Sequence, residues 1–432
     1  MRNTLVRAAA MSPFSMGLVI LAVAIVIRAA IAVSLGLYQE PINFGELESI
    51  GRSITETGVF GNPYKIPTGP TAHGAPFYPY LLSVIYHLLG YGQAAHGVVL
   101  MCATFFTALA LAMLPQLAVR VGLPAWIGGG AGMLGALFPF RAMTELSWEV
   151  PYAVTGWILV LIVTIDWIRT PTPARSLGCG AAWGALFWIA PQLMPPLALI
   201  LLTSVRILGW RTTRKAIPLV AVAAAIVIFP WIWRNYRTFG AWSFVRGNLG
   251  IELAAAHSPG AQPDYISNCL PADPNKYCLA RHPFTSAAEA AVVKNMGEAA
   301  YNRWRTQEAL GYIAADPGAF LERTAKRIVL FWFTPSGGIP AKDLILYPLS
   351  ILSFIGAWRL VRHIPDAGGI LASCLVGYPL PYYLLSLMTR YIVPLFWLIL
   401  FLAAYALATF SPVSIGKMGV QPLEETPGRQ RA

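Results

Sequence analysis

Residues 14–38 read FSMGLVILAVAIVIRAAIAVSLGLY and contain one charged side chain, Arg28. An α-helix needs about 20 apolar residues to cross the hydrocarbon core of a bilayer, so this run is long enough to span it. The run is also long for a signal peptide, and no A-x-A cleavage site follows it. We therefore expect the segment to be retained as the first membrane span.

The composition of the whole chain indicates the same environment. Of its 432 residues, 56% are hydrophobic and 12% are charged, whereas soluble domains contain about 25% charged residues. The net charge is +12, but lysines and arginines lie mostly in loops, which favours membrane orientation and anionic lipids over nucleic acid as partners. We predict an all-α, polytopic membrane protein that forms a single integral membrane domain over residues 1–432.

Further apolar runs bring the prediction to about ten transmembrane helices. After the first span, they cover residues 96–119, 125–140, 150–167, 177–190, 193–208, 216–233, 344–361, 368–388 and 391–410. Two of these runs are short and flank Pro191, Pro195 and Pro196. Proline is tolerated in membrane helices where neighbouring helices satisfy the freed backbone groups.

The basic residues of the short loops predict the orientation, because positively charged loops stay in the cytoplasm. If the helices alternate, one side collects Arg2, Arg7, Arg120, Arg169, Arg175, Arg206, Arg211, Arg214, Lys215, Arg359 and Arg362. This places residues 39–95 and 234–341 on the outer, periplasmic or extracellular face. Residues 411–432 then form a cytoplasmic tail that we expect to be disordered. The predicted location is the cytoplasmic (inner) membrane.

Both outer segments are predicted to be partly helical and to rest on the membrane surface. In the first, a short amphipathic helix follows the first span, and residues 78–89 form a helix too short to cross the bilayer. In the second, Ser286 and Glu289 have the spacing of a capping box. Asp316 and Pro317 have the pattern of a helix start.

The five cysteines do not show the spacing of metal ligands, and we predict no metal site. Cys102, Cys179 and Cys374 fall inside apolar runs, as structural thiols do. Cys269 and Cys278 lie in the second outer segment, where an oxidising exterior permits a disulfide. The sequence leaves this pairing open, because it does not give the geometry.

Two carboxylates, Glu46 and Glu48, follow the first span in FGELESIGRS. A carboxylate held at a membrane helix end against apolar surroundings can accept a proton near neutral pH. Because the two side chains are two positions apart on a helix, they point to different faces, and only one is expected to face a pocket. The alternative interpretation is a solvated acidic loop beside Arg52.

Several motifs resemble bacterial members of the GT-C superfamily, which includes protein O-mannosyltransferases and the aminoarabinose transferases of lipid A. In the first outer segment the matching residues are Glu46, Ile50-Gly51, Ser53-Ile54, Gly58, Phe60, GPTA, Pro76, Tyr78-Pro79 and LLG. Further along, the matching stretches are FPWIWRNYRTFG, GNLGIEL, DPGAFLERTAKRIVLFW and TRYIVPLF. The match covers most of the chain in order, and its specificity lies in the set.

The resemblance implies a reaction and roles for several residues. In this superfamily a carboxylate of the first outer loop deprotonates an acceptor hydroxyl, which attacks a lipid-phosphate sugar with inversion. Glu46 matches this base. Arg390 and Arg234, expected at the outer membrane boundary, are candidates for binding the phosphate, with Tyr391 beside Arg390. Each arginine could instead be a snorkelling interfacial residue.

Other positions carry weaker expectations. Glu149 matches a second acidic residue of the superfamily, with Glu145 or a plain loop carboxylate as alternatives. His73 is expected to line the acceptor side, although a lone histidine is more often a packing residue. Arg28 inside the first span is a functional candidate, or else a structural tie to a carboxylate of the bundle.

The predicted function is a polyprenyl-phosphate-sugar-dependent glycosyltransferase, a hexosyl or pentosyl transferase whose acceptor is an unknown glycan, lipid or protein. Gln192 stands where relatives commonly have arginine, and Gly45 precedes Glu46 in place of an acidic pair; both leave the acceptor class open. The sequence contains neither a Gly-rich nucleotide loop nor Asp-x-Asp, so we expect no cofactor beyond the donor lipid and no obligatory divalent metal. A secondary transporter, a non-catalytic lipid-binding protein and a polymer transferase of the O-antigen-ligase type are the alternatives.

Overall fold

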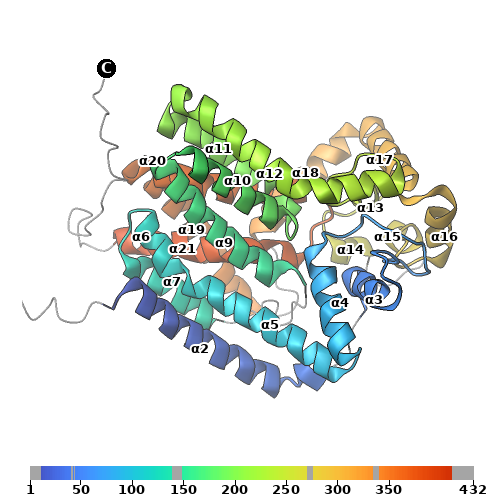
Figure 1. Ribbon diagram of the computed structural model, residues 1–432, viewed down its shortest axis with the longest axis horizontal. Coiled ribbons are helices and arrows are strands. Elements are labelled where there is room, and N and C mark those ends of the chain that lie inside the picture. The colour runs from blue at the N-terminus through green and yellow to red at the C-terminus, as the bar shows by residue number, and fades with distance from the viewer. Residues whose placement is uncertain are drawn as a thin grey trace, which may run out of the picture.

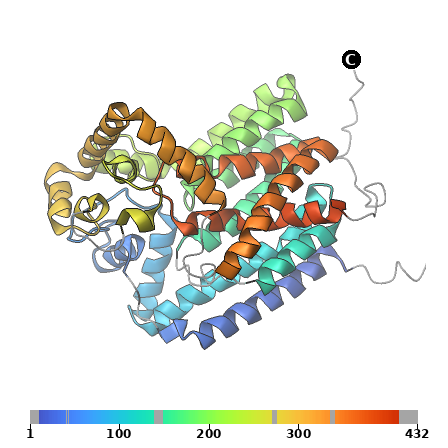
Figure 2. The same cartoon turned by 180° about the vertical axis from the view of Figure 1, so that it is seen from behind.

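The computed structural model describes residues 11–39, 42, 44–138, 148–269, 276–333 and 340–410. These residues form a helical bundle with a cap of shorter helices at one end (Figures 1 and 2). The described residues contain no named strand, only isolated bridges such as the one between Gly61 and Pro70. The predicted all-α membrane fold is confirmed.

The bundle contains the helices expected to span the membrane. They are α2 (Pro13–Ser34), α5 (Gln93–Ala112), α6 (Leu114–Arg120), α7 (Ala125–Leu137), α9 (Val150–Arg169), α10 (Pro173–Phe187), α11 (Met194–Leu208), α12 (Trp210–Phe239), α19 (Pro340–His363), α20 (Pro365–Gly377) and α21 (Phe396–Phe410). In the described part of the chain, 7 helical stretches are long and apolar enough to cross a membrane. The remaining predicted spans correspond to the shorter helices α7, α10 and α20.

One predicted span is wrong in its second half. The expected helix 368–388 ends at Gly377, and Leu380–Tyr383 form a 3-10 turn, η3, instead. Pro379 and Pro381 explain the change, because proline lacks the backbone N–H of a helix interior and clashes with the preceding turn. A second 3-10 segment, η4 (Thr389–Leu395), then leads into α21.

Glycines allow the bundle helices to approach closely. A Cβ atom added at Gly356 of α19 would lie 2.0 Å from the carbonyl oxygen of Leu402 in α21. At Gly180 of α10, an added Cβ would lie 2.1 Å from the carbonyl oxygen of Val220 in α12. Small residues at helix contacts are how membrane bundles gain packing energy without a hydrophobic driving force between helices.

The cap consists of helices from both predicted outer segments, which lie side by side at one end of the bundle (Figures 1 and 2). They are α3 (Glu46–Thr57), α4 (Phe77–Leu89), α13 (Leu249–His257), α14 (Tyr265–Cys269), α15 (Tyr277–Ala280), α16 (Ala287–Met296), α17 (Glu298–Ala315) and α18 (Pro317–Trp332). Two predicted helix starts are present: Ser286 Oγ accepts from the Glu289 N–H, and Asp316 Oδ1 accepts from the Ala319 N–H.

Internal bonds hold the cap together. The buried Arg305 guanidinium forms ion pairs with Glu289 at 2.6 Å and Glu308 at 2.5 Å, and this joins α16 to α17. Cys269 is disulfide-bonded. The side chain of Cys278, its expected partner, lies outside the described residues. Residues 411–432, predicted to be a tail, also lie outside them.

Candidate active site

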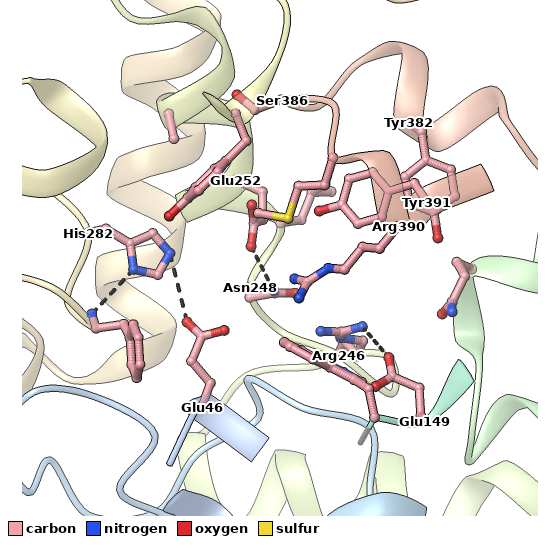
Figure 3. A pocket seen from close by; sticks show the side chains of 18 of the residues that line it. Glu46, Glu149, Arg246, Asn248, Glu252, His282, Tyr382, Ser386, Arg390 and Tyr391 are labelled. Atoms are coloured by element: carbon pink, nitrogen blue, oxygen red, sulfur yellow. Dashed lines mark hydrogen bonds and ion pairs between the residues drawn. The ribbon is translucent and has the colours of Figure 1, made fainter. Parts of the chain in front are cut away.

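A cavity of about 520 Å³ lies where the cap meets the bundle. Its volume falls within the range of about 300–1,000 Å³ that small-molecule sites occupy. The wall is built from segments far apart in sequence, and its charged or ionisable side chains are Glu46, Glu149, Arg246, Glu252, His282 and Arg390 (Figure 3). The cavity therefore concentrates charge at the boundary between an apolar bundle and a polar cap.

Glu46 is the first residue of α3, after the N-cap residue Gly45. A helix N-terminus favours a negative charge there. The Glu46 Oε2 atom is 3.1 Å from His73 Nε2, and the Oε1 atom is 3.9 Å from His282 Nε2. Burial raises the pKa of Glu46, but the charges of His73, His282 and Arg246 outweigh it and lower this pKa to about 2. Glu46 is therefore a carboxylate at neutral pH, and its buried Oε1 atom accepts no hydrogen bond from the described residues.

His73 is an ion-pair partner of Glu46. Its side chain is fully buried, and its Nδ1 atom lies 3.3 Å from the Tyr64 hydroxyl. Burial lowers the pKa of His73, but the neighbouring Glu46 charge reverses this and raises it above the usual value. Glu298 fixes the loop that carries His73, since its carboxylate accepts from the Thr71 hydroxyl at 2.5 Å and from the Ala72 N–H at 2.7 Å. His73 pairs with Glu46 but is not among the residues that line the cavity, so its expected place on the acceptor side stays a prediction.

Arg246 and Glu149 form a pair on another wall. The Arg246 Nη1 atom is 3.4 Å from Glu149 Oε1, and Arg246 Nε donates to the carbonyl oxygen of His73 at 3.4 Å. Burial raises the pKa of Glu149, and the charges of Arg246 and Arg390 offset only part of this effect. Glu149 thus lines the cavity as expected, whereas its competitor Glu145 lies outside the described residues.

Arg390 and Tyr391 line the same cavity as Glu46. The Arg390 guanidinium carbon is 4.0 Å from the ring centroid of Trp148, and the Tyr391 ring stacks on Tyr382 at 4.4 Å. Within the described ranges, Arg390 has neither a hydrogen bond nor an ion pair. Figure 3 shows its guanidinium group pointing into the cavity. A cation held on an aromatic face without an ion pair is suited to bind an anion.

Two predicted substrate-binding arginines have structural positions instead. Arg234 donates to the carbonyl oxygens of Thr71 at 2.6 Å and Phe60 at 3.0 Å, and its guanidinium packs over Trp231. It therefore clamps the loop that carries His73 and does not line the cavity. Arg28 is fully buried in the bundle, where it donates to the carbonyl oxygen of Gly135 at 3.0 Å. Backbone carbonyls of Ala24 and Gly135 accept from its two Nη atoms, whereas its buried Nε–H has no hydrogen-bond partner in the described structure.

Several cavity residues were not predicted. Asn248 donates to Glu252 at 3.3 Å, and His282 approaches Glu46.

Glu48 is buried outside the cavity lining, with the Tyr78 hydroxyl at 3.5 Å. Burial, with the charges of Glu149 and Glu46, raises the pKa of Glu48 to about 7. Of Glu46 and Glu48, geometry therefore selects Glu46 as the carboxylate that a cavity ligand can reach.

The described residues contain no group of three or more His, Cys, Asp or Glu side chains arranged to hold a metal ion. Gln192 also lines the cavity and carries no charge. The cations available there are consequently those of Arg246 and Arg390.

Comparison with solved structures gives the fold. The archaeal oligosaccharyltransferase AglB from Archaeoglobus fulgidus, solved with an inhibitory peptide and a dolichol-phosphate, superposes with a TM-score of 0.51 at 13% identity, over 91% of this chain and 50% of that chain. The same enzyme tethered with an acceptor peptide gives 0.49 at 15% identity, over 91% and 49%. ArnT from Cupriavidus metallidurans, bound to undecaprenyl phosphate, gives 0.32 at 14% identity, over 88% and 77%.

The chain thus spans about half the length of the AglB chain that it matches. No family model and no curated protein matches the sequence. At these identities the likeness concerns the fold alone. The motifs along the sequence predicted the same fold. The chain has the fold of the GT-C superfamily of membrane glycosyltransferases.

Proposed function

We propose that the protein is a glycosyltransferase that moves a sugar from a polyprenyl-phosphate carrier to an acceptor hydroxyl at the outer face of the cytoplasmic membrane. The observation that carries this proposal is the meeting of Glu46 with Arg246 and Arg390 in one cavity between bundle and cap. A transfer of this kind needs a base facing the acceptor and cations facing the departing phosphate. AglB, which has this fold, binds dolichol-phosphate in its solved structure.

The donor phosphate would bind at Arg390, whose guanidinium has no other partner in the described residues, with Arg246 as the second cation. The planar guanidinium matches phosphate oxygens through paired N–H donors. A small apolar hollow lined by Leu111, Val154 and Trp397 adjoins the cavity, since Val150 lines both. This hollow offers a route for the first isoprene units of the carrier among α5, α9 and α21.

The acceptor hydroxyl would lie between Glu46 and His282. The Phe284 backbone N–H donates to His282 Nδ1 at 3.2 Å, so Nε2 is the ring nitrogen that can donate toward Glu46. The gap of 3.9 Å between this Nε2 and Glu46 Oε1 is too long for a direct hydrogen bond. A hydroxyl oxygen in this position accepts from His282 and donates its proton to Glu46, which satisfies the otherwise unpaired Oε1 atom.

In the proposed step, the acceptor oxygen attacks the anomeric carbon on the face opposite the phosphate, and the configuration inverts. The bond between the anomeric carbon and the phosphate oxygen breaks, and the electron pair stays on the phosphate. Arg390 and Arg246 stabilise the charge that develops there. The hydroxyl proton passes to Glu46, so the products are the glycoside, the polyprenyl phosphate and a protonated carboxyl group.

The test uses the purified protein in lipid vesicles with a panel of radiolabelled polyprenyl-phosphate sugars and hydroxyl acceptors. Glu46→Gln is expected to retain the donor and to lose transfer by about 100-fold or more, because general-base catalysis contributes about 10²–10⁴-fold. The matched control is Glu56→Gln, which makes the same change on the exposed side of α3, where Glu56 pairs with Arg52. This control is expected to transfer at the parent rate.

Transfer at the parent rate by folded Glu46→Gln would remove Glu46 from the reaction. A parent protein that binds the carrier phosphate but transfers no sugar from the panel would instead favour the non-catalytic lipid-binding alternative.

A further inference from the structure

The extended segment 241–248 is a wall between two cavities. Its backbone is fixed from several sides: the Trp231 indole donates to Val245, and the Gly247 N–H donates to Ala72 at 2.7 Å. Phe244, Arg246 and Asn248 line the cavity described above, whereas Ser243 and Gly247 line a second cavity. Leu249 lines both cavities and is 59% exposed, so both border its side chain.

The second cavity has a volume of about 420 Å³, which also falls within the small-molecule range of about 300–1,000 Å³. Its floor forms where α13 crosses α17, since a Cβ atom added at Gly250 would lie 2.1 Å from the carbonyl oxygen of Asn302. The rest of its lining comes from α17, the wall segment, Phe239 at the end of α12 and Ala72. Nothing in the proposed transfer step uses this space.

Uncharged hydrogen-bonding groups in this second cavity lack partners. The buried Asn302 Oδ1 atom accepts no hydrogen bond in the described structure. The side chains of Ser243 and Gln307 likewise form no hydrogen bond with described residues. Asn302 Oδ1 needs a donor, Gln307 can both donate and accept, and Ser243 offers a hydroxyl.

The cavity also has an aromatic surface. Trp242 is 65% exposed and stacks on Tyr236 at 4.4 Å, which fixes the plane of its ring. A pyranose ring buries the apolar face of its C–H groups on such a surface while its hydroxyls reach neighbouring amides. Of the residues that line this cavity, Arg303 is the only cation and Glu298 the only anion, and Thr71 and Ala72 already occupy the Glu298 carboxylate. This lining suits a neutral, hydroxyl-rich ligand better than a phosphate.

We propose that the second cavity is a saccharide-binding subsite, which holds a sugar unit of the acceptor while the reactive hydroxyl reaches Glu46 across Leu249. This assignment rests on the proposed glycosyl transfer for the identity of its ligand as an acceptor. The binding of a sugar in this cavity can be measured separately. The subsite also lies against Glu298, which anchors the loop that carries His73.

The test is binding of the full-length protein, fluorescently labelled in detergent, to a panel of immobilised mono- and oligosaccharides of defined linkage. Binding is expected for the parent and for Glu46→Gln, and Trp242→Ala and Gln307→Ala are expected to weaken it by about tenfold, equivalent to about 1.4 kcal/mol. The matched control is Trp233→Ala, which removes an exposed tryptophan of the same aromatic stack that does not line the cavity. A circular dichroism melt verifies that each variant is folded.

The outcomes separate this inference from the proposed transfer. Absence of binding to every saccharide, or equal binding by Trp242→Ala, Gln307→Ala and the parent, would overturn the subsite even if sugar transfer is active. Loss of binding in Trp233→Ala to the same extent would also overturn it, because the aromatic stack rather than the cavity would then be responsible. Saccharide binding that fails only in the cavity variants supports the subsite even if no transfer is found.

Discussion

The pairing of Glu46 with His73 makes a quantitative prediction about pH. The pKa of Glu46 is about 2 instead of 4.5, which corresponds to a preference of about 3 kcal/mol for the ionised form. Burial acts in the opposite direction, so the positive charges around Glu46 supply more than this net difference, and His73 contributes the largest lowering effect. Replacing His73 with Gln keeps a hydrogen-bond donor but removes the charge. We therefore expect the pKa of Glu46 to rise by about one unit or more.

The assay is kcat/KM for sugar transfer as a function of pH. In the parent protein Glu46 is ionised throughout the accessible acidic range, so protonation of this group does not limit the rate above about pH 3. In His73→Gln, the acidic limb of the profile should move upward by about one pH unit or more. The matched control is His87→Gln, because His87 is exposed in the last turn of α4. An acidic limb that stays in place in folded His73→Gln would refute the assignment of Glu46 as the titrating base.

The same pair predicts how stability depends on pH. Glu46 has a lowered pKa in the folded state, so it contributes stability above its ordinary value of 4.5 and loses it as the pH falls toward 2. His73 has a raised pKa, so it contributes stability below its ordinary value of 6.5 and loses it as the pH rises. The difference in melting temperature between the parent and His73→Gln should therefore be largest between about pH 4.5 and 6.5. A difference that does not vary with pH would mean that the pair is not charged.

Other expected effects follow from the remaining contacts. Arg390→Ala should lower kcat/KM by about 10- to 100-fold, because a charge-assisted hydrogen bond contributes about 1.5–3 kcal/mol. Arg390→Lys should recover only part of this loss. Transfer at the parent rate by both variants would exclude the phosphate role of Arg390. His282→Ala should raise the KM for the acceptor by about three- to tenfold without changing donor affinity, and a change in donor affinity alone would contradict the proposed position of the hydroxyl. Arg234→Ala should lower the free energy of unfolding by about 2 kcal/mol, because it removes two hydrogen bonds and leaves the Thr71 carbonyl without this donor. A chemical-denaturation series with unchanged stability would show that the clamp is dispensable.

The bundle could be predicted from sequence because apolar runs of sufficient length have few alternatives to a membrane helix. The boundaries were least accurate where proline intervenes, as in the segment after Gly377. Glu46, Glu149, Arg390 and Tyr391 were predicted through motifs, and the structure brings them to one cavity. Their chemical environment was not predictable, because it depends on partners far away in the chain.

Two cases illustrate this limit. Arg234 near the end of α12 and Arg390 in η4 both stand at the cap end of the bundle, and composition does not distinguish them. The difference is that the loop carbonyls of Phe60 and Thr71 saturate Arg234, whereas Arg390 is held only by aromatic rings. His282 offered no sequence signal, since its role depends on a backbone N–H that fixes which ring nitrogen carries the hydrogen.

The early end of α20 has a consequence for how a lipid substrate meets the protein. Beyond Gly377 the backbone continues through 3-10 turns, next to a cavity lined by Tyr382, Ser386 and Arg390. Irregular backbone at this depth is tolerated only beside protein or water, because lipid tails cannot satisfy its polar groups. We therefore expect hydration to extend inward at this point and to thin the hydrocarbon barrier locally. A carrier phosphate could then reach the guanidinium groups while remaining solvated, without entering an apolar medium.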